Sequence, residues 1–174
     1  FNRFWDNCHK ILDKCSRVNL TVMSTYNALS VPNYKKLIGG IYDLKKSYGS
    51  SDRYWKSAVF LDSSYLRYPT HQAVQILPKK WNSVIFEQAQ YADYLGIPLF
   101  ENKFIGYSDI EVQKIKRIWD WKISNWPDKE KHIKEHRYNF IKFFDEHDRR
   151  RGTNFVKVFP ELEEFYNMCK EISL

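Results

Sequence analysis

The chain has few cysteines, glycines and prolines, and it contains no long apolar run. Its 174 residues include three cysteines, six glycines and six prolines. Cys8, Cys15 and Cys169 lack the spacing of a metal site or a disulfide framework, which favours buried thiols in a reducing compartment. Apolar runs such as Ala58–Leu61 are far shorter than the roughly 20 residues of a membrane span. We therefore expect a cytoplasmic protein without a membrane segment and without a bound metal of its own.

Several signatures of catalysis and targeting are also missing. The sequence contains no glycine-rich phosphate loop and no G-x-S-x-G elbow. It starts at Phe1, with neither an initiator methionine nor a basic segment followed by an apolar one. We interpret Phe1 as a cut end of a longer chain.

The composition is that of a globular protein with a surplus of positive charge. Hydrophobic residues make up 43% of the chain and aromatic residues 17%, which excludes disordered and fibrous classes. Lysine and arginine total 28 against 21 acidic residues, so the formal charge is +7. This surplus favours anionic partners, such as nucleic acid, phosphorylated cofactors or acidic substrates.

The first third of the chain alternates between helical and strand patterns. Apolar residues at helical spacing predict a helix over residues 1–15, and Pro32 is well placed to begin a second one. The apolar runs Leu20–Met23 and Lys56–Leu61 predict short strands. This order is typical of α/β proteins with parallel strands, which are buried on both faces.

After Pro69 the pattern becomes mainly helical. His71–Leu77 alternates polar and apolar residues and is expected to be a short extended piece. Ser108 and Glu111 form a capping box at the start of a later helix. Further helices are expected over 81–95, from Pro127 to the arginines before Gly152, and from about Pro160.

Two strands are too few for an independent parallel sheet, because sheets usually contain four to six and protect their edges. We therefore interpret the chain as the C-terminal portion of something longer. The expected fold class is α/β: a partial (β/α) barrel with two or three parallel strands, followed by a helical C-terminal extension. The predicted boundary lies after residue 77, with the barrel part over 1–77 and the extension over 78–174.

Several segments carry a resemblance to one enzyme family. The strand that leads into Thr25-Tyr26-Asn27, the helix after Pro32 and the strand at Val59–Asp62 resemble the later strands of the radical S-adenosylmethionine (radical SAM) barrel. Tyr65–Gln72 and the tail from Arg149 to Glu161 resemble C-terminal extensions of some members. The family's C-x₃-C-x₂-C motif is nowhere in this chain, so the resemblance implies that it lies upstream of Phe1.

The resemblance implies an enzyme that uses a 4Fe-4S cluster to cleave S-adenosylmethionine reductively into a radical. It implies that this chain works with the N-terminal remainder of the same protein. The sequence does not identify the substrate, for which an anionic molecule and a peptide are the open alternatives. Without the cysteine motif, the 174-residue chain alone is expected to hold neither cofactor and to be inactive. The alternative is a basic α/β nucleic-acid-binding module without catalytic activity, tested by salt-dependent binding to DNA or RNA.

In a parallel barrel the chemistry lies at the carboxyl ends of the strands. The resemblance therefore implies cofactor contacts from Ser24, Tyr26, Asn27 and Asp62. It implies substrate contacts from Arg67, His71, Arg150 and Arg151. Structural roles stay open for three of them: Asn27 as a turn residue, Asp62 as a loop cap and Arg67 as an ion-pair partner.

Two further clusters have alternative interpretations. His132 and His136 share a helix face at a spacing that suits zinc, but no glutamate directly follows His132, and we favour a solvated face. The arginines at 149–151 either bind an anion or stabilise the C-terminus of a helix that Gly152 caps.

Overall fold

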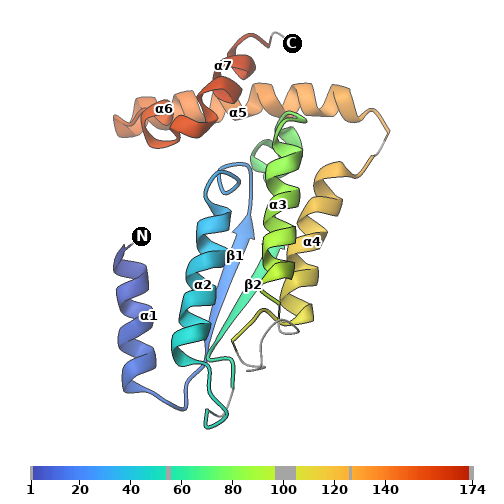
Figure 1. Cartoon of the computed structure of the whole chain (residues 1–174). Coiled ribbons are helices and arrows are strands. Elements are labelled where there is room, and N and C mark those ends of the chain that lie inside the picture. Colours follow the sequence, from blue (N-terminus) through green and yellow to red (C-terminus); the bar gives the residue numbers. More distant parts are fainter. Residues whose placement is uncertain (1, 54–55, 97–104, 126, 173–174) are drawn as a thin grey trace. The chain divides into compact units, whose positions relative to one another are not determined.

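The computed structural model describes residues 2–53, 56–96, 105–125 and 127–172. The protein is 63% helical (Figure 1). The helices are α1 (Asn2–Lys14), α2 (Tyr34–Tyr48), α3 (Trp81–Tyr94), α4 (Asp109–Ile123), α5 (Lys129–Arg151), α6 (Phe155–Val158) and α7 (Glu163–Lys170). The strands are β1 (Leu20–Tyr26) and β2 (Val59–Tyr65), which pair in parallel and are connected through α2.

The prediction of a partial (β/α) barrel is wrong. Within the described ranges the sheet has two strands, and the rest of the regular structure is helical. Strand β1 alternates between covered and exposed residues, and Met23 is 81% exposed. A barrel strand would be buried on both faces, so this pattern fits a small sheet with one face open. The parallel pairing of the two strands is the part of the prediction that holds.

Local expectations for the later segments mostly agree with the structure. Ser108 and Glu111 form the predicted capping box, with reciprocal backbone-to-side-chain hydrogen bonds of 2.9 and 3.4 Å. Gly152 ends α5 in the left-handed conformation at φ 62°, which glycine adopts without strain. His71–Leu77 is not extended: Thr70–Gln72 and Val74–Ile76 form two 3₁₀ turns. The predicted extended piece is therefore not a strand of the sheet.

The chain divides into two compact units, each of which is discontinuous in sequence. Unit 1 comprises residues 1–24, 33–64 and 86–117, and unit 2 comprises residues 25–32, 65–85 and 118–174. The predicted boundary after residue 77 is a different division and remains a prediction.

Unit 1 is built from α1, α2 and parts of the sheet and of α3 and α4. Helix α1 lies alongside α2 (Figure 1), and Gly40 permits this approach because a side chain there would meet the Trp5 ring at 2.5 Å. The core of unit 1 includes Leu12, Ile38 and Leu61, each 1% exposed or less. It also encloses an ion pair between Lys45 and Glu111, 3.0 Å apart and each 1% exposed.

Unit 2 has an aromatic core between α5 and the two short helices that follow it. Helices α6 and α7 both contact α5 (Figure 1). Phe140 of α5 packs against Phe155 and Phe165, with ring centroids 5.4 and 5.1 Å apart. Phe155 also stacks on Tyr166 at 4.7 Å. This core fixes α5 next to the 3₁₀ turns at 70–76, with which it is also in contact.

Candidate functional site

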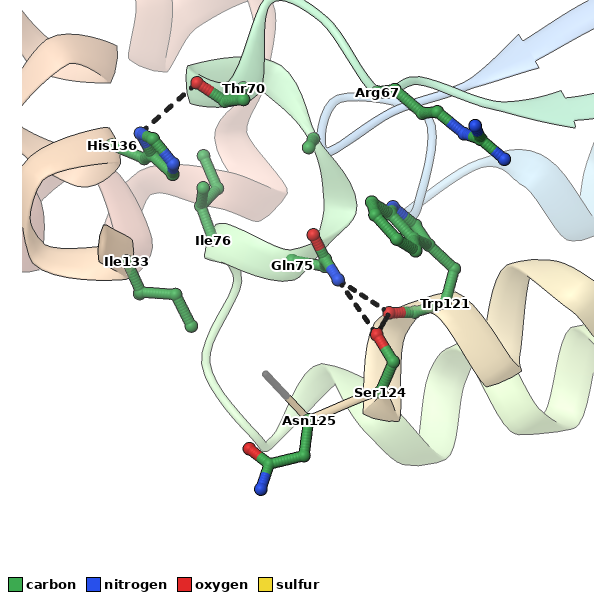
Figure 2. Close-up of a pocket in the computed structure, with 10 residues that line it drawn as sticks. Arg67, Thr70, Gln75, Ile76, Trp121, Ser124, Asn125, Ile133 and His136 are labelled. Atoms are coloured by element: carbon green, nitrogen blue, oxygen red, sulfur yellow. Dashed lines mark hydrogen bonds between the residues drawn. The ribbon is translucent and has the colours of Figure 1, made fainter. Parts of the chain in front are cut away.

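A pocket of about 440 Å³ in unit 2 lies beside the segment that follows the carboxyl end of β2. Figure 2 shows its lining, drawn from this segment, the 3₁₀ turns, the end of α4 and the first half of α5. The residues that line it are Arg67, Thr70, Ala73, Gln75, Ile76, Trp121, Ser124, Asn125, Ile133 and His136. Apolar walls with a few polar groups are typical of small-molecule sites. We call it the Arg67 pocket.

Arg67 and Trp121, which both line the Arg67 pocket, each contact the ring of Tyr65, a residue outside the lining. The Arg67 guanidinium lies 5.2 Å from the centroid of the Tyr65 ring and donates a hydrogen bond of 3.0 Å to its hydroxyl. Tyr65 in turn stacks on Trp121, with centroids 4.9 Å apart and planes 18° from parallel. The lining thus combines an exposed guanidinium with the Trp121 ring, an arrangement suited to a carboxylate attached to an apolar body.

Gln75 fixes the loop that begins at the end of α4. Its side-chain amide donates to the Trp121 carbonyl at 2.9 Å and to the Ser124 hydroxyl at 3.1 Å (Figure 2). Because Gln75 is 8% exposed, these bonds satisfy an amide that would otherwise be costly to bury. Gln75 therefore has a structural role, because its hydrogen bonds hold the end of α4 against the 3₁₀ turns that line the pocket.

Two histidines lie close together near the same pocket. The His136 ring nitrogen Nδ1 and the Thr70 hydroxyl are 3.2 Å apart. His71 is half-buried, and its Nε2 has no hydrogen-bond partner in the part of the chain that the structure describes. Burial, together with the charge on His136, lowers the pKa of His71. Burial is also the main cause that lowers the pKa of His136. Both rings are therefore favoured in the neutral form.

A second pocket of about 580 Å³ in unit 2 is rich in positive charge. It shares Gln75, Asn125 and Ile133 with the first. Its charged lining consists of Lys79, Lys122, Lys129, Arg137 and one carboxylate, Glu130. We call it the basic pocket.

Buried Lys122, half-buried Arg137 and half-buried Lys129 in the basic pocket each donate a hydrogen bond to a main-chain carbonyl, which for Lys129 is that of Ser124. Lys122 Nζ donates to the Leu77 carbonyl at 2.6 Å, and Arg137 Nε donates to the Ile76 carbonyl at 2.6 Å. Burial, followed by the charges of Lys129 and Arg137, lowers the pKa of Lys122 to about 8.

The predicted cofactor contacts lie in different surroundings. Ser24 and Asp62 belong to unit 1, whereas Tyr26 and Asn27 belong to unit 2. Asp62 is paired with Lys114 at 2.6 Å. Tyr26 is 1% exposed, so its side chain is part of the core.

Asn27 adopts the structural alternative considered from the sequence. Its side-chain oxygen accepts hydrogen bonds from the backbone of Leu29 at 2.9 Å and of Ser30 at 3.2 Å. It also accepts one from the Ser30 hydroxyl at 3.2 Å. These bonds form an Asx turn directly after β1, so the oxygen is already satisfied by its own loop.

The predicted substrate contacts separate into two groups. Arg67 lines the pocket, and His71 lies in the neighbouring turn, where its charge interacts with that of His136. Arg150 and Arg151 are exposed near the C-terminus of α5 and line neither pocket. Arg150 bonds instead to Glu146 at 2.5 Å, and hydrogen bonds from Arg149 and Arg150 hold the pKa of Glu146 at about 2. This geometry supports a charge-stabilised helix end that Gly152 caps.

The described residues do not fit an iron–sulfur cluster or another metal centre. They contain no group of three or more histidines, cysteines or carboxylates able to hold an ion. Cys8 and Cys15 belong to unit 1 and Cys169 to unit 2, so neither unit offers the three thiolates that the family's motif supplies. His132 and His136 stack at 6.3 Å without a third ligand residue.

Sequence patterns missed most of the pocket. The sequence alone predicts no role for Trp121, Lys122 or Gln75. Their roles depend on contacts across 46 and 45 residues, which periodicity cannot reveal. The one available signal was the position of the Gln75 amide and the Lys122 ammonium group beside apolar residues, where a polar group needs a partner when it is buried.

Comparison with protein-family models, with curated proteins and with solved structures found no match to this chain. Across the described helices, none is both long and apolar enough to cross a membrane.

Proposed function

We propose that this chain contributes the substrate-binding part of a radical SAM enzyme, and that the Arg67 pocket takes a carboxylate substrate with an apolar body. The carrying observation is the position of Arg67, two residues after the carboxyl end of β2 and on the rim of a pocket. Ligands of parallel α/β sheets bind at this end of the strands.

The chemistry of the lining supports this choice of substrate. A guanidinium binds a carboxylate through two parallel hydrogen bonds. Among the residues that the structure describes, the Arg67 guanidinium, which has five donors, bonds to one side chain, that of Tyr65. The adjoining Trp121, Ile76 and Ile133 supply apolar surface for the remainder of the molecule. His136 is a polar group elsewhere on the rim of the same pocket (Figure 2).

The cluster and the cleavage of S-adenosylmethionine are assigned to the N-terminal remainder that the resemblance implies. Because the described residues do not fit the cluster, we assign no step of radical formation to them. Their part in the reaction is to bind and orient the substrate and to exclude water.

The enzyme assignment is tested on the complete reading frame. It should encode three clustered cysteines before Phe1, and the full protein should take up iron and sulfide on anaerobic reconstitution and turn brown. The 174-residue chain, treated in parallel, should remain colourless. A complete frame without clustered cysteines, or a full protein that takes up no iron, overturns the assignment.

The pocket is tested separately on the 174-residue chain. Benzoate, a minimal apolar carboxylate, should bind saturably in ligand-observed NMR, and Arg67→Gln should weaken it about tenfold. The matched control is Arg151→Gln, which removes the same charge from an exposed position outside both pockets. Equal loss in both variants, or no saturable binding, overturns the carboxylate site.

A further inference from the structure

We infer that the basic pocket is a binding site for a small polyanion that carries phosphate or carboxylate groups. Four cationic side chains line this one cavity of about 580 Å³, against a single carboxylate. The inference concerns other cations than Arg67, and it stands whether or not the Arg67 pocket takes a substrate.

Three of the four cations of the basic pocket lack an anionic partner among the described residues. Lys79, Lys122 and Arg137 form no salt bridge with any described carboxylate. Lys122 is 6% exposed, and the hydrogen bond that it makes goes to a neutral carbonyl. Burying a cation such as Lys122 without a counter-charge is costly, and the cost falls when an anion occupies the pocket that it lines.

Mutual repulsion among the cations supports the same conclusion. The charges of Lys129 and Arg137 add to burial in lowering the pKa of Lys122, and the charge of Lys79 adds to burial in lowering that of Lys129. Glu130 is the acidic group on the lining, and it is exposed. A bound anion would raise the pKa of Lys122, so binding near pH 8 should take up protons.

The form of the site favours a small molecule over a nucleic acid. Nucleic-acid surfaces spread cations along an exposed stripe, whereas these four surround one cavity that includes a buried lysine. The buried Asn82 oxygen Oδ1, on a lining residue, has no hydrogen-bond partner among the described residues.

The test is calorimetric titration of the 174-residue chain with pyrophosphate and with citrate, at a constant ionic strength of about 0.15 M. We expect one-site binding of at least one of the two, weakened about tenfold or more by Lys79→Gln and by Arg137→Gln. Lys79 is exposed and its side chain makes no hydrogen bond to a described residue, so Lys79→Gln tests the site without disturbing the core. Arg151→Gln is the matched control and should bind as the wild type does.

Two further readouts identify the ligand and the residue. Stronger binding of pyrophosphate assigns the site to phosphates, and stronger binding of citrate assigns it to carboxylates. Titration at pH 8 in buffers of different ionisation enthalpy should show proton uptake, and Lys122→Met should abolish it. The inference is overturned if neither anion binds saturably, if Arg151→Gln weakens binding as much as the pocket variants, or if a single-stranded oligonucleotide binds more tightly than both.

Discussion

Lys122 shows how one buried charge sets a pH dependence. The folded protein holds its pKa at about 8, mainly through burial, against an ordinary value of 10.5. Between these two values the unfolded chain retains a proton that the folded chain has released. Stability contributed by this residue therefore rises with pH across that window, and the penalty for burying the charge is complete below it.

Replacing Lys122 by methionine should remove this dependence. We expect Lys122→Met to gain on wild type at about pH 7 and to lose roughly 2–3 kcal/mol of that relative gain by about pH 10.5. Urea unfolding of both proteins across this range measures the difference, in which the titration of shared tyrosines and cysteines cancels. Lys131→Met, at an exposed position, is the control and should differ from wild type by a constant amount. If the difference in unfolding free energy between Lys122→Met and wild type does not change with pH, the lowered pKa of Lys122 is refuted.

Glu111 joins three elements of unit 1. It caps the start of α4 through Ser108, accepts a 2.8 Å hydrogen bond from the backbone of Leu61 in β2, and pairs with Lys45 of α2. The capping box was predictable because its two members are three residues apart. The pairing with Lys45 was not, because 66 residues separate the partners and only the folded chain brings them together.

Neutralising Glu111 should therefore lower the stability of the folded protein strongly. We expect Glu111→Gln to reduce the free energy of unfolding by about 3–5 kcal/mol, because it leaves the Lys45 ammonium buried without a counter-charge. Chemical denaturation measures the loss, and Glu163→Gln, at an exposed position of α7, is the matched control. Adding Lys45→Met to Glu111→Gln should recover part of the loss. A small cost for the single variant, without recovery in the double one, would show that the pair carries little energy.

At the scale of the whole molecule, the sequence predicted helices better than it predicted the sheet. Helical periodicity is local, and it located the segments that became α3, α4 and α5. The barrel expectation failed because the apolar run at Leu20–Met23 was taken as evidence of burial on both faces, whereas Met23 is exposed. The two pockets could not be predicted from local sequence patterns, because their lining residues come from separate stretches of unit 2.

The cysteines offer a probe of both units. Cys15 is exposed, whereas Cys8 in unit 1 and Cys169 in unit 2 are buried. Burial raises the pKa of Cys8, and it raises that of Cys169 to about 12 despite the opposing charge of Arg137. Since the thiolate is the reactive form, iodoacetamide should modify Cys15 at least about tenfold faster than the other two. Peptide mass spectrometry measures the rates, with denaturant as the control in which all three react. Rapid native modification of Cys169 would contradict the packing of α7.

The Lys45–Glu111 pair also has a consequence for behaviour on heating. Water orders itself strongly around exposed ions, so the hydration that the pair gives up becomes less favourable as temperature rises. The penalty for enclosing these two groups therefore shrinks in warm solution, while their attraction across 3.0 Å persists. Unit 1 thus contains an interaction that contributes relatively more to stability at high temperature than in the cold.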